Sequence, residues 1–309
     1  MEWKKPDLPS LIKRLEIPEG TVDMVLDTDT YNEIDDQFAI SFMLRSPERI
    51  NVLGFTAAPY FNAKSTGPAD GMEKSYDEII KLLKLAGREE LIARTYRGSK
   101  EYLPDEKTPV DSPAAHFLAE LADGYSAENP LYIAAIGAFT NVASAFLMNP
   151  SMKDKVVLIL LGGNAPYMPP MKEFNLSQDI AAGRVLFGSG APVVQLPCAG
   201  CVDRFVTDRY ELEHWLVDKN PLADYLARNT IEEAESYASG TAWTRVIWDV
   251  TTVGWLLNDG GRYMKDEIIP TELPTYDNSY EQGPEGEVMR RVYWINRDEL
   301  FTALFRKLV

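Results

Sequence analysis

Cysteine and histidine are scarce in this chain of 309 residues, which contains two of each. Two cysteines cannot cross-link a disulfide-stapled scaffold, and their scarcity makes the cytoplasm the expected compartment. The two histidines, His116 and His214, are too few for a histidine-rich zinc centre. Disulfide-rich folds and histidine-based zinc chemistry are therefore excluded.

Basic residues and long apolar runs are also in short supply. Against 31 Lys and Arg stand 47 Asp and Glu, which gives a formal charge of −16. So acidic a surface repels phosphate backbones and anionic lipids, which argues against nucleic acid as a partner. Because no apolar run is long enough to span a bilayer, we expect no membrane association. Carboxylates are the abundant chemical group.

Short apolar runs alternate with segments of helical period along the chain. Strands are predicted at 24–26, 50–55, 131–136, 155–161 and 193–196, and helices at 35–44, 72–83, 141–147 and 180–187. This alternation predicts an α/β fold with a mostly parallel open sheet flanked by helices, forming a single domain over residues 1–309. Residues 203–257 are expected to be mainly helical. The Gly, Pro and acid-rich segment 259–288 predicts a loop excursion, followed by a strand at 292–295 and a helix at 297–307.

The most informative segment joins the first strand to the first long helix. Asp27 and Asp29 end the strand, and Glu33, Asp35 and Asp36 follow within a few residues. The carboxyl end of a parallel strand is where open α/β folds place their ligand crevice. Crowded ionised carboxylates are costly unless a cation neutralises them. Oxygen ligands of this kind select Ca²⁺ or Mg²⁺, so we expect a hard-cation site here.

Asp27-Thr28-Asp29-Thr30 also resembles the opening motif of HAD-type Mg²⁺-dependent phosphohydrolases. Those enzymes need a downstream Gly-Asp pair to complete their metal site. This sequence contains no Gly-Asp dipeptide, which counts strongly against that alternative.

Four segments in register resemble the nucleoside hydrolases, the inosine–uridine preferring N-ribohydrolase family. They are residues 26–36, with Asp-x-Asp and Asp-Asp; 136–143, with Gly-Ala-Phe-Thr-Asn; 161–175, with Gly-Gly and Glu-Phe-Asn; and 248–250, Trp-Asp-Val. The resemblance covers roughly residues 20–260. The turn between Asp29 and Asp35 is two residues longer than the commonest family form. The family's activity is hydrolysis of the N-glycosidic bond of ribonucleosides to ribose and a free base.

The resemblance implies a Ca²⁺ ion held by Asp29, Asp36, Asp249 and the Ile136 carbonyl. It also implies that Asp29 is the general base that takes a proton from the attacking water, while Asp27 supports the loop through hydrogen bonds. Asp249 can alternatively be read as a helix N-cap, because an apolar helical stripe follows it.

Asp35, Asn62, Glu173 and Asn175 resemble the family's ribose contacts, and Asn164 is a further candidate. Trp248 stands at a position where many members of the family carry histidine. The purine-preferring branch of the family carries tryptophan there. A tryptophan cannot donate a catalytic proton, but it can stack on a purine, so purine nucleosides are the expected substrates and purine salvage the expected role. The family also tends to form homodimers or tetramers.

Cys198 and Cys201 have the C-x-x-C spacing of redox pairs and zinc sites. Neither the helix that follows a redox pair nor two further zinc ligands are present nearby, so structural thiols are expected. A second alternative to the enzyme is a metal-dependent nucleoside- or sugar-binding protein without turnover. The longer first turn and the absent histidine motivate that alternative.

Overall fold

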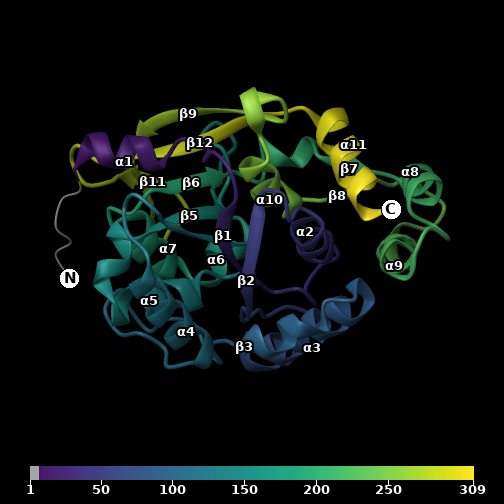
Figure 1. Cartoon of the computed structure of the whole chain (residues 1–309), viewed down its shortest axis with the longest axis horizontal. Coiled ribbons are helices and arrows are strands. Elements are labelled where there is room, and N and C mark those ends of the chain that lie inside the picture. Colours follow the sequence, from purple (N-terminus) through teal and green to yellow (C-terminus); the bar gives the residue numbers. More distant parts are fainter. Residues whose placement is uncertain (1–6) are drawn as a thin grey trace.

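Eight strands form the central sheet of the computed structural model, which describes residues 7–309 (Figure 1). Their order across the sheet is β3-β2-β1-β4-β5-β6-β12-β9. Neighbouring strands pair in parallel, except that β9 runs antiparallel to β12. The strands are β1 (Val22–Thr28), β2 (Ile50–Ala57), β3 (Thr95–Arg97), β4 (Leu131–Ala135), β5 (Val156–Leu161), β6 (Val193–Leu196), β9 (Met264–Pro270) and β12 (Val288–Ile295).

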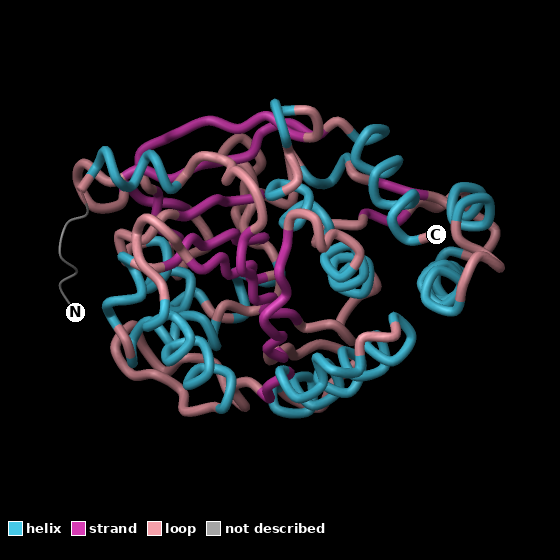
Figure 2. Tube along the Cα trace, viewed as in Figure 1, coloured by secondary structure: helices cyan, strands magenta, loops and turns pink. Residues whose placement is uncertain are grey.

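Helices cover both faces of this sheet (Figure 2). On one face lie α4 (Pro113–Leu121), α5 (Thr140–Met148) and α7 (Ile180–Phe187), and on the other α2 (Asp35–Leu44), α3 (Pro68–Ala86), α9 (Pro221–Ala238), α10 (Val250–Leu256) and α11 (Arg297–Leu308). The other α-helices are α1 (Leu8–Arg14), α6 (Phe174–Gln178) and α8 (Arg209–Trp215), and β7 (Val206–Thr207) pairs with β8 (Arg245–Val246). The predicted α/β class, mostly parallel sheet and single domain are confirmed.

Strand β5 shows why the central strands are apolar throughout. Val157, Ile159 and Leu161 face one core cluster, whereas Val156, Leu158 and Leu160 face the other. Successive side chains of a strand point to opposite faces, so a strand covered by helices on both sides needs apolar residues at every position.

Residues 259–288 correct a prediction, because they are not a simple loop excursion. They supply the edge strand β9 and a hairpin of β10 (Glu272–Pro274) and β11 (Tyr280–Gln282). The alternation of apolar and polar residues that predicts a strand is interrupted in β9 by three consecutive charged residues, Lys265, Asp266 and Glu267. Charged side chains and proline are typical of edge strands, where one side of the backbone stays unpaired.

The carboxyl ends of the parallel strands lie at one edge of the sheet and position four polar or glycine-rich segments there. Asp29 follows β1, Ile136 follows β4, Gly162 follows β5 and Cys198 follows β6. Helices α2 and α10 pack against each other, which brings their first turns to the same edge. Within residues 7–309, no helix has the length and apolar character needed to cross a membrane.

The central position of β5 generates a prediction for stability. The fully buried Ile159 contacts the core, so Ile159→Ala is expected to lower the free energy of unfolding by about 2–5 kcal/mol. Ile268→Ala is the matched control, because Ile268 on the edge strand is 39% exposed. Urea unfolding of both variants measures the difference, and equal losses would contradict the assigned core.

Candidate active site

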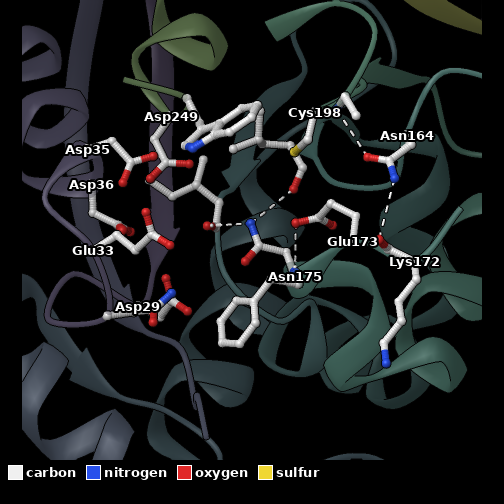
Figure 3. Close-up of a pocket in the computed structure, with 16 residues that line it drawn as sticks. Asp29, Glu33, Asp35, Asp36, Asn164, Lys172, Glu173, Asn175, Cys198 and Asp249 are labelled. Carbon is white, nitrogen blue, oxygen red and sulfur yellow. Dashed lines mark hydrogen bonds between the residues drawn. The ribbon is translucent and has the colours of Figure 1, made fainter. Parts of the chain in front are cut away.

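A cavity of about 310 Å³ opens at the carboxyl edge of the sheet (Figure 3). Most of the carboxylates gather on one side of this cavity, and Glu173 lies on the other side together with Asn164, Asn175 and Cys198. It is lined by Asp29, Asn32, Glu33, Asp35, Asp36, Ile136, Leu161, Asn164, Lys172, Glu173, Phe174, Asn175, Cys198, Ala199, Trp248 and Asp249.

Three of the carboxylates form a tight cluster. One oxygen from each of Asp35, Asp36 and Asp249 lies within 4.8 Å of the others, and all three residues are buried. Asp35 and Asp36 occupy the first turn of α2, where the helix dipole favours negative charge. Asp249 precedes α10, but its side chain makes no capping hydrogen bond and faces Asp36 instead. The alternative role of Asp249 as a side-chain N-cap is therefore not observed.

Burial and mutual repulsion make these carboxylates hard to ionise. Burial raises the pKa of Asp36 to about 7. The hydrogen bond that the Thr28 hydroxyl donates to Asp36 acts in the opposite direction and lowers this pKa. Burial also raises the pKa of Asp249 and of Asp29 well above their ordinary values, and neighbouring aspartates add to both shifts. A cation would relieve this penalty, because it favours the charged form of every carboxylate near it.

The donor set fits a hard cation. Asp29 Oδ2 and Asp35 Oδ1 are buried oxygens without a hydrogen-bond partner in the described chain. Such orphaned oxygens are costly unless something binds them. The Ile136 carbonyl lines the same cavity and accepts from Asn175 Nδ2 at 2.9 Å, which leaves a second lone pair. An all-oxygen site of this kind suits Ca²⁺ or Mg²⁺.

All four predicted metal ligands line the cavity, but only two of them belong to the tight carboxylate cluster. Asp36 and Asp249 belong to the tight cluster, together with Asp35, which was predicted as a ribose contact. Asp29 and Ile136 line the cavity outside that cluster. Adjacent helical residues point about 100° apart, yet both Asp35 and Asp36 bring one carboxylate oxygen into the tight cluster.

Asp27 does not line the cavity and instead fastens the strand end from behind. Its Oδ1 accepts hydrogen bonds from Thr56 Oγ1 at 2.6 Å and Asn141 Nδ2 at 2.8 Å. Asn141 also donates to the Ala57 carbonyl at 3.0 Å. These bonds tie β1 to β2 and α5, which is the supporting role expected of Asp27.

Glu173 and Asn175 form the opposite side of the cavity and are fixed by backbone contacts. Glu173 caps α6 and accepts hydrogen bonds from the amides of Gly163, Asn175 and Leu176 at 2.8–3.0 Å. Burial raises the pKa of Glu173, and these backbone donors act against that shift. Asn175 Nδ2 donates to the carbonyls of Ile136 and Leu161. Both side chains are therefore oriented in advance.

Gly163 must be glycine for two reasons. Its φ is +73°, and an added Cβ would stand 1.9 Å from the hydroxyl of Tyr280. Tyr280 belongs to β11, so the hairpin that replaces the expected loop excursion closes the back of the cavity wall. The hydroxyl of Tyr280 accepts from Gln195 Nε2 at 3.0 Å, which ties the hairpin to β6.

Asn62 is the predicted site residue that the structure does not bring into the cavity. Its Nδ2 donates to Asn32 Oδ1 at 2.6 Å, and Asn32 lines the cavity in its place. Asn32 was not predicted as a site residue, and Glu33 was counted in the acidic segment without a role of its own, although the longer turn that contains both was a signal. The Glu33 carboxylate pairs with Arg245 at 3.1 Å.

Trp248 and Cys198 complete the side of the cavity nearest β6 and α10. Trp248 is half-buried, lines the cavity and packs against the core, so it serves both as a wall and as an anchor. Cys198 is a buried free thiol, and burial raises its pKa, which keeps it protonated. Cys201 is likewise buried and free, in keeping with structural thiols. Asn164 lines the cavity, with Oδ1 accepting from the Ala199 amide at 3.0 Å.

The raised pKa of Asp36 generates a pH prediction. Without a divalent cation, native Asp36 holds its proton up to about pH 7, whereas in the unfolded chain it loses that proton near pH 3.8. The folded state therefore loses stability as the pH rises from about 4 through 7. Asp36→Asn removes this titration, so its free energy of unfolding should rise relative to wild type over the same interval.

Urea unfolding in chelator at several pH values measures that difference. Added Ca²⁺ should stabilise wild type more than Asp36→Asn, because the cation binds the ionised carboxylate. A difference that stays constant from pH 4 to 8 would contradict a buried, repelled Asp36.

Comparison with known proteins agrees with this geometry. A family model described as inosine-uridine preferring nucleoside hydrolase matches residues 24–288. The non-specific ribonucleoside hydrolase RihC of Salmonella enteritidis is 26% identical over 252 residues, which cover 77% of this chain and 79% of that protein. A probable ribonucleoside hydrolase of Dictyostelium discoideum is 32% identical over 100 residues, 30% of this chain and 29% of that protein.

Solved structures share the fold. A plant nucleoside hydrolase, PpNRh1, superposes with a TM-score of 0.71 at 19% identity, covering 93% of this chain and 98% of its own. A purine-preferring ribonucleoside hydrolase from Gardnerella vaginalis gives a TM-score of 0.69 at 21% identity, with the same coverage. The phosphohydrolase alternative is not favoured by any of these matches. The chain belongs to the inosine–uridine preferring nucleoside hydrolase family and is an N-glycosyl hydrolase.

Proposed function

We propose that this chain hydrolyses the N-glycosidic bond of ribonucleosides, purine nucleosides above all, with the help of a Ca²⁺ ion. The observation that carries the proposal is the carboxylate cluster with its orphaned buried oxygens, set opposite a wall of pre-oriented polar groups. A hard cation would satisfy the first side, and the hydroxyls of a sugar would satisfy the second.

The cation would be held by Asp29, Asp36, Asp249 and the Ile136 carbonyl, with Asp35 beside them. Their ligand atoms are all oxygens, and among residues 7–309 the only sulfur that lines the cavity is the protonated thiol of Cys198, so calcium is favoured over zinc. When bound, the cation would lower the pKa of a water molecule in the site and so prepare it as a nucleophile.

Asp29 is the proposed general base. It directly follows β1 and lines the cavity, and one of its oxygens has no partner among the described residues. That oxygen can accept the proton of the water that attacks the anomeric carbon. As the glycosidic bond breaks, positive charge develops on the sugar, and the surrounding aspartates stabilise it electrostatically.

Asp35, Glu173 and Asn175 are the proposed ribose contacts. Carboxylates accept hydrogen bonds from sugar hydroxyls, and Asn175 can also accept one through Oδ1, since its Nδ2 already donates to two carbonyls. Because backbone amides fix Glu173, little ordering is left for the moment of binding.

Trp248 is the proposed platform for the base. An indole stacks well on a two-ring purine, and the half-buried Trp248 offers part of its surface to the cavity. In the described part of the chain no histidine lines the cavity, so the departing base would take its proton from solvent. The cytoplasmic location and the dimeric or tetrameric state stay predictions.

Release of reducing sugar from a panel of purine and pyrimidine nucleosides, with Ca²⁺ and with chelator, tests the reaction. We expect calcium-dependent release by the wild type. Asp29→Asn should reduce kcat by about 10²–10⁴-fold, because the amide cannot accept the proton.

Calorimetric titration with nucleoside separates the enzyme from a binding protein. A chain that binds nucleoside in Ca²⁺ but releases no sugar would be a non-catalytic binder, and the proposed reaction would be wrong. Exposed Asp154→Asn serves as the control and should keep full activity.

Trp248→Leu tests the base platform. Loss of stacking should lower kcat/KM for purine nucleosides by about 10-fold or more, and for pyrimidine nucleosides by less, because the smaller ring loses less contact. Steady-state kinetics on inosine and uridine give the ratio. Equal losses on both would mean that Trp248 serves only as a core anchor.

A further inference from the structure

The turn that joins β1 to α2 carries a side chain that the proposed reaction has not yet used. Asn32 is 5% exposed and lines the cavity. Its backbone is held at both ends: its amide donates to the Asp29 carbonyl at 2.7 Å, and its carbonyl accepts from Lys64 Nζ at 2.7 Å. The position of the side chain is therefore set by the turn itself.

A chain of hydrogen bonds fixes which end of the Asn32 amide faces the cavity. The backbone amide of Lys64 donates to Asn62 Oδ1 at 2.9 Å, so the other end of Asn62 must be its NH₂ group. That group donates to Asn32 at 2.6 Å, which identifies the accepting atom as Asn32 Oδ1. The end of Asn32 that is left over is its NH₂ group, a donor.

Within residues 7–309 this donor has no hydrogen-bond partner, and it is not one of the unpaired atoms that are fully buried, so it is open to the cavity that Asn32 lines. A donor held at a cavity wall forms its hydrogen bond only when water or a ligand in the cavity accepts from it. The cavity into which Asn32 faces is dominated by acceptors, namely the carboxylates of Asp29, Glu33 and Asp35. Donors supplied by side chains are few on that side.

A sugar hydroxyl matches such a pairing of donor and acceptor. It donates one hydrogen bond and accepts others, so it can donate to a carboxylate and accept from an amide at the same time. We propose that Asn32 Nδ2 donates to a hydroxyl oxygen of the substrate sugar and that Asn62 is a positioning residue that orients Asn32. This inference rests on the proposed function, since it presupposes a ribonucleoside in the cavity.

Substrates that lack single hydroxyls test this contact directly. Wild type, Asn32→Ala and Asn62→Ala are compared on a ribonucleoside and on its 2′-, 3′- and 5′-deoxy forms, by kcat/KM. We expect Asn32→Ala to lose about 10-fold on the ribonucleoside, and to lose almost nothing on the one deoxy form whose missing hydroxyl is the partner. Asn62→Ala should show the same pattern with a smaller loss.

Two further variants keep the test decisive. Asn32→Leu has nearly the shape of asparagine but no N–H, and it adds no charge to the carboxylates, so it should lose the same discrimination even if Asn32→Ala folds poorly. Asn51→Ala is the control, because exposed Asn51 binds Asp23 at the far end of β2 and should keep wild-type kinetics.

The possible results distinguish a failure of the Asn32 contact from a failure of the proposed function. Equal losses on all four substrates by the folded Asn32 variants would overturn the contact while the proposed function stands. A wild type that releases no sugar from any ribonucleoside would overturn the proposed function, and the contact with it.

Discussion

Mutual repulsion among buried carboxylates is the constraint on which the rest of this structure depends. Asp29, Asp35, Asp36 and Asp249 are each at least 97% buried, and folding brings them to one edge of the sheet. Their desolvation opposes folding, and two helix N-termini and a threonine hydroxyl offset only part of it. The stability for this arrangement must come from elsewhere, chiefly from the two apolar clusters on either face of the sheet. The site is a charged region held in place by an uncharged frame.

The polar groups behind the site keep that frame rigid. Asp27 links three elements through Thr56 and Asn141, and Glu173 takes three backbone donors. None of these bonds uses an oxygen of the tight cluster. Asp27 thus has a structural role outside the cavity, whereas Glu173 lines the cavity and is held in place there by its own backbone hydrogen bonds, as pre-organised sites require.

Much of the fold was predictable because buried strands and amphipathic helices each leave a period in the sequence. The ranges 35–44, 180–187 and 193–196 were predicted without error, and the acidic cluster followed from the position of Asp27 to Asp36 after an apolar strand. Edge strand β9 was not predicted, because its consecutive charged residues interrupt the two-residue alternation of apolar and polar side chains that indicates a strand. Asn62 was placed in the cavity, whereas Asn32 occupies it, because that choice depends on a contact between two loops, and local spacing says nothing of such contacts.

The turn from Thr30 to Ile34 has a consequence for how this cavity can vary. Its two flanking aspartates are placed mainly by elements outside the turn, Asp29 directly after β1 and Asp35 in the first turn of α2. The residues between them can therefore change in number or kind without moving the cation cage. The turn is an exchangeable module, so substrate selectivity can diverge there while the hydrolytic machinery stays the same.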